Sequence, residues 1–255
     1  MNTLLHYDLL RLEAFQNNPR VRDSISISHT QDLTLLKFLP VHYFNYCFGK
    51  IESKQVLGKV KDFYADAYQG QHQILVDSQD ELSKSVLKEA PEYCLYKKIG
   101  IMGLPPEVPF QYLNLENTEL IPASEENVGE FAWLYLRCFE AENRHAESVE
   151  ENFLQKFKTP GIQFYFIEWN KSRVGIAGLY AHADFQILSV AAVLPEFRNK
   201  GFHQSALTQR INICRERNQT STIYSWAYQD SISQGNMIKI GMSQVQELWV
   251  YRHVE

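Results

Sequence analysis

The clearest hydrophobic pattern of the chain lies in its last third, where a strand pattern is followed by a helix pattern. Residues 187–194 form the nearly continuous apolar run ILSVAAVL, which is typical of a β-strand buried on both faces. After a short polar turn, Leu207, Ile211 and Cys214 recur at helical spacing, with polar side chains between them. The pattern therefore predicts a strand, a turn and an amphipathic helix, and open α/β folds bind ligands at such turns.

Capping and turn residues predict the other elements of the second half. Ser124 precedes two glutamates, and Ser148 has the spacing of a capping box, so each marks the start of a helix. Gly241 suits the left-handed position that follows the end of a helix. The remaining elements predicted here are strands at 119–122, 163–169, 173–181, 222–228 and 246–252 and a helix at 231–240.

The first half of the chain shows a similar alternation of elements but no comparable glycine-containing turn. Its patterns predict helices at 3–15, 53–68 and 79–88 and strands at 23–28, 42–48 and 73–76. Three prolines close together in residues 103–109 break regular structure after these elements. We therefore expect an N-terminal α/β domain at 1–103, a linker at 104–114 and a second domain at 115–255.

Composition and charge exclude several classes of protein. The net charge of -5 argues against a general nucleic-acid or anionic-membrane binder, because such proteins need a positive field. The N-terminus lacks the pattern of a signal peptide, and no apolar run reaches membrane-spanning length, so a cytoplasmic protein is expected. The four cysteines are scattered, which predicts neither a metal site nor a disulfide framework.

The turn between the buried strand and the amphipathic helix has the chemistry of a phosphate site. Its sequence, PEFRNKGFHQ, combines Arg198 and Lys200 with Gly201. The unpaired N–H groups and positive dipole of a helix N-terminus attract phosphate, and glycine permits close approach. On spacing alone, a solvated strand-to-helix turn explains these residues equally well.

The surroundings of this turn resemble the pyrophosphate loop of the GNAT superfamily of acyl-CoA N-acyltransferases. The family pattern, Arg/Gln-x-x-Gly-x-Gly/Ala, falls on Arg198, Gly201 and His203, after the lead-in PEF. The resemblance covers residues 115–253 and implies an α/β (α+β) fold, with a mixed central sheet flanked by helices. The first half is similar, through residues 44–49, to the degenerate first half of two-domain members, which implies a smaller α/β domain of the same type.

The same resemblance implies acetyl-CoA as co-substrate. Backbone N–H groups of the turn would hold its pyrophosphate, and main-chain groups of the preceding strand would hold its pantetheine arm. N–H groups near Val193 would contact the thioester oxygen if the strand is bulged there, and we expect the imidazole of His203 to point outward. The implied cofactor-binding residues are Ala191, Val193, Arg198, Asn199, Lys200, Gly201, Phe202, His203 and Gln204.

The residues that transfer protons are less well defined. Met237 occupies the position where the family usually carries a tyrosine, and methionine cannot donate a proton. Tyr228 and Tyr180 are alternative donors, and Glu168 has the chemistry of a base. The predicted catalytic residues are Tyr228 and Glu168, whereas packing roles for both and catalysis by positioning alone stay open.

The function implied by the resemblance is transfer of an acetyl or other acyl group from acetyl-CoA to a primary amine. The acid-rich connection at 140–147 would border the pocket of a small-molecule or peptide acceptor, although such a charge run is also typical of a solvated face. The alternatives are a non-catalytic CoA-binding or regulatory module and an unrelated phosphate-ligand binder. Neither the acceptor nor the oligomeric state follows from the sequence.

Overall fold

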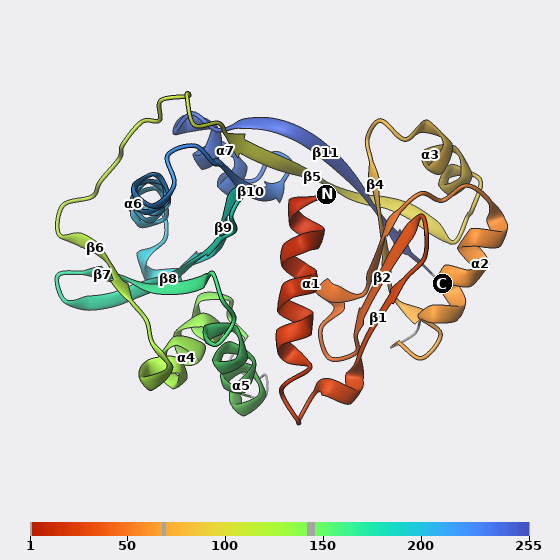
Figure 1. Ribbon diagram of the computed structural model, residues 1–255, viewed down its shortest axis with the longest axis horizontal. Helices are drawn as coiled ribbons and strands as arrows, with labels where there is room; N and C mark the ends of the chain where they lie inside the picture. Colours follow the sequence, from red (N-terminus) through yellow and green to blue (C-terminus); the bar gives the residue numbers. More distant parts are fainter. Residues whose placement is uncertain (1, 68–69, 142–145, 255) are drawn as a thin grey trace. The chain divides into compact units, whose positions relative to one another are not determined.

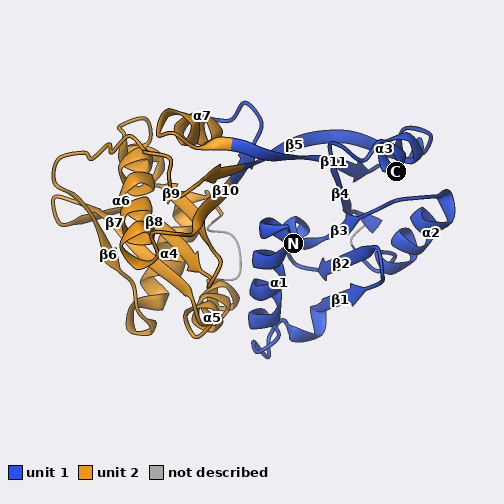
Figure 2. Ribbon diagram, turned by 45° about the horizontal axis from the view of Figure 1, so that its top comes forward, with its two compact units in different colours: residues 1–101, 226–231, 244–255 blue, residues 102–225, 232–243 orange. Residues whose placement is uncertain are grey.

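The computed structural model describes residues 2–67, 70–141 and 146–254, and it divides into two compact units. Unit 1 comprises Met1–Ile101, Trp226–Ser231 and Gln244–Glu255. Unit 2 comprises Met102–Ser225 and Ile232–Ser243 (Figure 2). The chain therefore returns twice from unit 2 to unit 1. In the predicted division, with a linker at 104–114, the chain passes from the first domain to the second only once.

Unit 2 is a mixed sheet with helices on both faces. Its strands are ordered β10-β9-β8-β7-β6, with β9 and β10 parallel and the other pairs antiparallel. Helix α6 covers one face, and α4 and α5 cover the other (Figure 1). The elements are β6 Thr118–Pro122, α4 Val128–Cys138, α5 Ala146–Phe157, β7 Ile162–Trp169, β8 Ser172–Ala181, β9 Phe185–Val193, α6 Phe202–Arg217, β10 Thr222–Tyr228 and α7 Ile232–Lys239.

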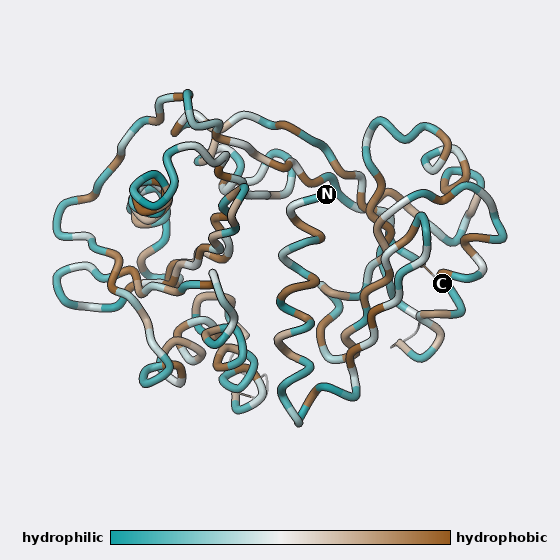
Figure 3. Tube along the Cα trace, viewed as in Figure 1, coloured by the Kyte–Doolittle hydropathy of each residue, from teal (hydrophilic) through white to brown (hydrophobic). Residues whose placement is uncertain are grey.

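The apolar face of the unit 2 sheet packs against aromatic side chains of the helices. Phe131 of α4 lies 5.0 Å from the rings of both Phe153 and Phe164, and all three side chains are buried. Strands β8 and β9 are accordingly mostly hydrophobic in Figure 3. Burial of this size stabilises a fold by about 1.5–3 kcal/mol for each large side chain.

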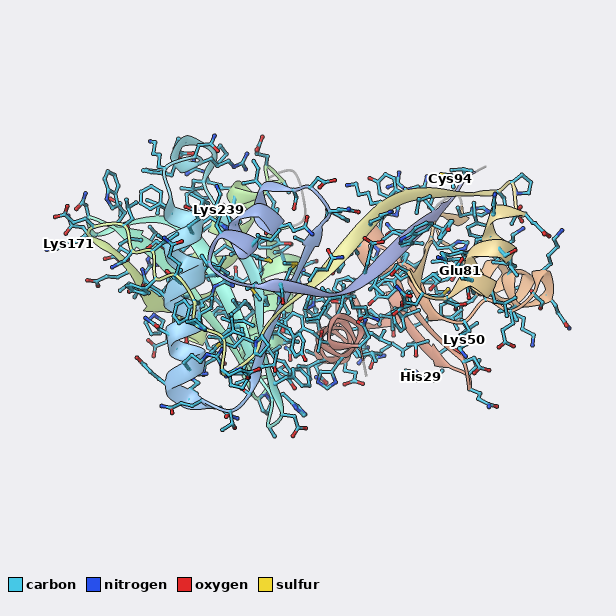
Figure 4. The ribbon with its side chains drawn as sticks, turned by 90° about the horizontal axis from the view of Figure 1, so that it is seen from above. His29, Lys50, Glu81, Cys94, Lys171 and Lys239 are labelled. Atoms are coloured by element: carbon cyan, nitrogen blue, oxygen red, sulfur yellow. The ribbon has the colours of Figure 1, made fainter. Side chains whose placement is uncertain are left out.

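Strands β7 and β8 are joined by a two-residue hairpin loop. Asn170 and Lys171 have φ of 47° and 65°, and two successive left-handed residues make the turn type that matches the twist of an antiparallel pair. Lys171 accordingly lies at the tip of this hairpin (Figure 4).

Unit 1 repeats part of this arrangement. Its strand order is β1-β2-β3-β4-β11-β5, in which β3 and β4 are parallel and β1/β2, β2/β3 and β4/β11 are antiparallel. Helix α2 connects the parallel pair, as α6 does in unit 2, and α3 follows β4 as α7 follows β10. The elements are α1 Thr3–Phe15, β1 Ile25–His29, β2 Leu33–Phe38, β3 Tyr46–Gly49, α2 Lys54–Phe63, β4 Gln73–Asp77, α3 Glu81–Lys88, β5 Tyr93–Leu104 and β11 Ser243–His253.

Several predictions for the first half are wrong. The sequence pattern did not predict β2 or the twelve-residue strand β5. Residues His42–Phe44 form a 3-10 turn rather than the start of a strand, and α2 ends at Phe63 rather than at 68. Strand β11, expected in the second domain, pairs with β4 of unit 1. Pairing of this kind joins distant parts of the chain, so the local periodicity of the sequence does not predict it.

Candidate functional site

The turn that leads from β9 to α6 presents a row of free backbone donors. After β9 a 3-10 turn, η5 Pro195–Phe197, leads to residues 198–201, and α6 begins at Phe202. The first helical bond is donated by Ser205 to Gly201 O, at 3.0 Å. No acceptor within the described residues takes the six N–H groups from Asn199 to Gln204. A helix start without partners in this form is an anion-binding arrangement.

Two left-handed residues give the turn its shape. Asn199 has φ of 62° and Gly201 has φ of 89°. Gly201 is the N-cap of α6, and no side chain caps the helix there. Since a capping hydroxyl or carboxylate would occupy the free donors, its absence at Gly201 leaves them to a ligand.

Arg198 anchors the turn instead of extending freely from it. Its guanidinium donates to Cys138 O at 2.8 Å and to Glu140 Oε1 at 2.7 Å. Cys138 is the last residue of α4, and Glu140 follows the helix. A weaker bond joins its Nε to Val193 O at 3.4 Å. The charge of Arg198 is therefore partly compensated by Glu140, while that of Lys200 remains at the exposed surface.

A cavity of about 600 Å³ opens beside these donors, and every residue that lines it belongs to unit 2. Eight of the nine predicted cofactor-binding residues line this cavity, and the exception is Lys200. The lining residues are Cys138, Phe139, Ala191, Ala192, Val193, Phe197, Arg198, Asn199, Gly201, Phe202, His203, Gln204, Ile232, Ser233 and Asn236.

Strand β9 has an open edge along the cavity. Its register with β10 extends only to Ile187 in the described structure. Further along, the N–H of Leu194 donates to Val174 O of β8 at 2.9 Å. Because alternate residues of an antiparallel strand direct their main-chain groups to opposite sides, Ala191 and Val193 face away from β8 and toward the open edge. This edge is the place that the sequence predicted for main-chain contacts with pantetheine.

A β-bulge interrupts the same strand, three residues before its predicted place. The pairs Ala177–Ala191 and Leu179–Leu188 leave two residues of β9 opposite one residue of β8. The residues without a register partner are Ser189 and Val190 on β9 and Gly178 on β8. The expected bulge near Val193 is thus wrong in position, because that residue pairs regularly with Gly175. The bulge also explains why residues 189–191 are only half-buried, against the predicted burial of both faces.

His203 points inward, which corrects the expected outward orientation. Gln204 Nε2 donates to Asn236 Oδ1 at 2.9 Å, and this bond sets the orientation of the Asn236 amide. The amide nitrogen of Asn236 then faces His203 Nδ1 at 3.3 Å as a donor. His203 Nδ1 is therefore the acceptor, and the neutral ring carries its hydrogen on Nε2.

Burial and the nearby Arg210 lower the pKa of His203 to about 4, so the ring is neutral at physiological pH. Nε2 has no hydrogen-bond partner in the described part of the chain. This atom is also not fully buried. A neutral N–H donor therefore lies at the wall of the cavity, next to the free backbone donors.

The predicted catalytic residues are not among the residues that line this cavity. Tyr228 belongs to unit 1, and its ring lies 4.1 Å from Lys97 Nζ. Glu168 is half-buried on β7, opposite Glu119 of β6. Tyr180 is buried on β8, and burial raises its pKa. None of the three lines the cavity of unit 2.

Other titratable groups near the cavity have limited chemistry. Burial raises the pKa of Cys138 to about 12, so its thiol is not a nucleophile at neutral pH. Met237, in the position where a tyrosine was considered, is a buried core residue. The acid-rich connection at 140–147 lies partly outside the described residues. Within the described ranges no group of three or more His, Cys, Asp or Glu side chains has the arrangement of a metal site.

Sequence reasoning missed two residues that the site depends on. Asn236, which orients His203, lies on α7 and is not near it in sequence. Arg210 is fully buried on α6. It follows Leu207 by three residues, so helical spacing puts it on the same apolar face of the helix. An arginine within an apolar helical stripe is the sequence feature that could have identified Arg210.

No family model matches the sequence, and the curated proteins compared with it give no match either. Solved structures do match. A GCN5-related N-acetyltransferase from Kribbella flavida is 13% identical, with a TM-score of 0.66 over 99% of this chain and 96% of that chain. A GCN5-related N-acetyltransferase from Sphaerobacter thermophilus is 14% identical, with a TM-score of 0.66 over 96% and 91%.

A tandem GNAT protein from the clavulanic acid biosynthesis pathway is 9% identical, with a TM-score of 0.63 over 96% of this chain and 93% of that chain. These matches extend over nearly the whole chain, so both units take part in the likeness. Because the identities are low, the likeness concerns the fold, and it confirms the predicted fold class. The chain has the fold of the GNAT N-acetyltransferases.

Proposed function

We propose that this protein binds acetyl-CoA in the cavity of unit 2 and transfers the acetyl group to a primary amine. The observation that carries the proposal is the row of six N–H groups from Asn199 to Gln204, which no protein acceptor takes in the described structure. Unpaired donors at a helix N-terminus favour a doubly charged group such as pyrophosphate. The fold of the solved N-acetyltransferases supports the same assignment.

The remaining wall of the cavity suits the other parts of acetyl-CoA. The main-chain groups of Ala191 and Val193 face the open edge of β9, where an amide-containing pantetheine arm would add to the sheet. Phe139 and Ile232 give the cavity an apolar side. Acetyl-CoA supplies an activated thioester, so the protein has to bind it, orient the amine and stabilise charge at the thioester oxygen.

The protein provides few groups for proton transfer at the cavity. Cys138 and His203 are neutral at physiological pH, and neither is a ready proton donor there. Orientation of an already neutral amine against the thioester therefore supplies most of the rate in this proposal. Tyr228 and Glu168 stay predictions for proton transfer.

Cofactor binding is tested first by thermal and calorimetric titration of the full chain. Saturating acetyl-CoA at about 100 times its Kd is expected to stabilise the fold by about 2.7 kcal/mol. AMP serves as the control, because a general phosphate binder would respond to it as strongly as to CoA. No stabilisation by millimolar acetyl-CoA would refute the proposal.

A second candidate function is a CoA-binding or regulatory module without activity. It is favoured by the buried Met237 in place of a tyrosine, and no described residue that lines the cavity is a tyrosine, an aspartate or a glutamate. Release of free thiol from acetyl-CoA in the presence of a broad panel of amines distinguishes the two. Amine-dependent release supports the transferase, whereas binding without release from any amine supports the module.

A further inference from the structure

Arg210 is a fully buried arginine with no carboxylate partner in the described residues. It lies on the apolar face of α6, with 1% of its surface exposed. Burial lowers its pKa to about 10, so it stays charged at neutral pH. Removing such a cation from water costs several kcal/mol, and an apolar residue of similar size would often be more stable. The position therefore calls for a reason other than stability.

Among the described residues, the hydrogen bonds of the guanidinium all go to backbone carbonyls, and two of these carbonyls lie at the bulge. Its Nη1 donates to Gly178 O at 2.8 Å and to Ser189 O at 3.3 Å. Its Nε donates to Ala206 O, one turn earlier on the same helix, at 3.2 Å. Gly178 and Ser189 are residues without a register partner between β8 and β9. Arg210 thus binds the carbonyls that the bulge removes from the ladder.

The direction of one peptide follows from these contacts. The carbonyl of Leu188 accepts from Ser225 Oγ of β10 at 2.9 Å, so it faces the β10 side. The next carbonyl, of Ser189, accepts from the same Arg210 Nη1 that binds Gly178 O of β8, so it faces the β8 side. A trans peptide holds its C=O and N–H in opposite directions. The N–H of Val190 therefore points toward the open edge of β9.

We infer that Arg210 is a positioning residue that holds the Ser189–Val190 peptide so that the Val190 N–H donates to the thioester oxygen of bound acetyl-CoA. The inference rests on the proposed function. No proton moves to or from Arg210, which acts only through the peptide that it holds. A fixed donor of this kind stabilises charge that develops on the carbonyl oxygen during transfer.

A purely structural role predicts a different result from a positioning role. If Arg210 only supported the fold, its loss would weaken binding of CoA and of acetyl-CoA alike. A positioning role affects only the acyl group, so the affinity for CoA stays the same and the polarisation of the bound carbonyl is lost. The carbonyl stretch of acetyl-CoA labelled with 13C at the acetyl carbonyl reports that polarisation directly.

The experiment compares this infrared band in the wild-type protein and in Arg210→Met. The wild-type band is expected at lower frequency than that of acetyl-CoA in water, and the shift is expected to disappear in Arg210→Met. Where an acceptor amine is known, the rate of transfer falls by up to about 10²-fold. Arg215→Met is the matched control, because Arg215 of the same helix donates to Pro105 O at 2.6 Å and does not contact the bulge.

A second variant disturbs the bulge without changing any charge. In Gly178→Ala the added Cβ would lie 2.6 Å from Ser189 Oγ, so Ser189 has to shift at the bulge. Gly178→Ala is expected to lose the band shift as well, and it serves if Arg210→Met does not fold.

Three results would overturn the inference. They are an unshifted band in the wild-type complex, an unchanged shift in a folded variant, and a parallel loss of CoA and acetyl-CoA binding. Failure of the wild-type protein to bind acetyl-CoA would instead refute the proposed function, and this role with it.

Discussion

His203 illustrates how a residue that departs from a motif is accommodated by its neighbours. A backbone N–H needs no side chain, so a glycine or alanine at this position would serve the turn. The imidazole is instead turned inward and held by Asn236, with Gln204 setting the direction of the amide. This places a neutral donor, Nε2–H, beside the free backbone donors, and it does so without adding a titrating charge near pH 7.

The orientation of His203 predicts a specific effect of Asn236→Asp. A carboxylate accepts from both neighbours, so it draws the hydrogen of the neutral ring to Nδ1 and leaves the Nε2 lone pair facing the phosphates. We expect acetyl-CoA affinity to fall about tenfold at pH 8, the size of one lost hydrogen bond to a charged group. Affinity should recover as the pH falls, because the carboxylate favours the imidazolium.

Calorimetric titration at pH 6 and pH 8 checks this prediction. The wild-type affinity should be the same at both, since the pKa of His203 is about 4. Asn236→Leu removes the bond to His203 without adding charge and should show no such recovery. Equal pH profiles for the wild type and Asn236→Asp would contradict the assigned tautomer.

His72 of unit 1 predicts a loss of stability in acid. Its ring lies between Tyr64 and His253, with Nδ1 2.7 Å from Gly70 O and Nε2 2.8 Å from the Tyr93 hydroxyl. Burial lowers the pKa of His72 to about 4 from 6.5. The unfolded chain therefore takes up the proton first, and stability falls between pH 6.5 and pH 4. The loss amounts to about 3 kcal/mol at about 1.4 kcal/mol per pH unit.

Urea unfolding across this pH range measures the effect. His72→Phe keeps the stacking and should flatten the pH dependence, although His203 contributes with the same sign. His29→Gln removes a surface histidine (Figure 4) and is the matched control. The assignment to His72 fails if both variants keep the slope of the wild type.

At the scale of elements, the free main-chain groups of the site come from one strand, one turn and one helix. Strand β9 leaves β10 after Ile187, and α6 starts without a side-chain cap, so main-chain groups of both elements are free at the cavity. The turn depends on Gly201, whose φ of 89° other residues adopt only at a cost. A Cβ there would meet nothing within 4 Å, so the cost is purely conformational.

Gly201→Ala is therefore expected to lower stability by about 1–2 kcal/mol and to weaken acetyl-CoA binding as the turn shifts. Gly58→Ala is the matched control, because Gly58 lies inside α2 and its added Cβ also meets nothing within 4 Å. That variant should raise stability by about 0.5–1 kcal/mol. Thermal unfolding and titration with acetyl-CoA measure both, and a stabilising Gly201→Ala would contradict the account of the turn.

The elements differ in how far local chemistry revealed them. Helix α1 and strand β10 have the predicted bounds, since each has a periodicity of its own and clear limits. The sequence did not predict strand β5, because its exposed residues 94–96 are Cys, Leu and Tyr. The alternation of polar and apolar residues that marks a half-buried strand is therefore missing. Strand β3 begins after a short 3-10 turn, at Tyr46, because Asn45 uses its side chain to bind Phe38 N at 2.8 Å.

At the scale of the whole molecule, the two units share a topology but differ in the turn that follows the first strand of their parallel pair. In unit 1 the corresponding turn follows β3. Its first donors are taken, whereas the N–H groups of residues 52–55 have no acceptor within the described residues. Lys50 N donates to Asp32 O at 3.1 Å, and Ile51 N donates to Ser83 Oγ at 2.7 Å. Ser53 caps α2 through its side chain, unlike Gly201 at α6. The lining of the nearby cavity includes three acids, Asp77, Asp80 and Glu81, and one lysine, Lys50.

This difference predicts one acetyl-CoA per chain. Acidic side chains and the side-chain cap at the start of α2 oppose binding of a pyrophosphate in unit 1. Isothermal titration should give a stoichiometry of one, and Gly201→Ala should weaken that single site. A second equivalent of bound acetyl-CoA that survives this substitution would show that unit 1 also binds the cofactor.

Residues close together in the sequence were enough to predict the turn and its free donors, because a strand, a glycine and a helix start are local features. The open edge of β9, the inward ring of His203, the carbonyl contacts of Arg210 and the pairing of β11 with β4 were decided by tertiary structure. Each depends on groups far apart in the chain, whose approach leaves no periodicity in the sequence. The turn with its free donors could therefore be found from the sequence, whereas the groups that would orient the reaction could not.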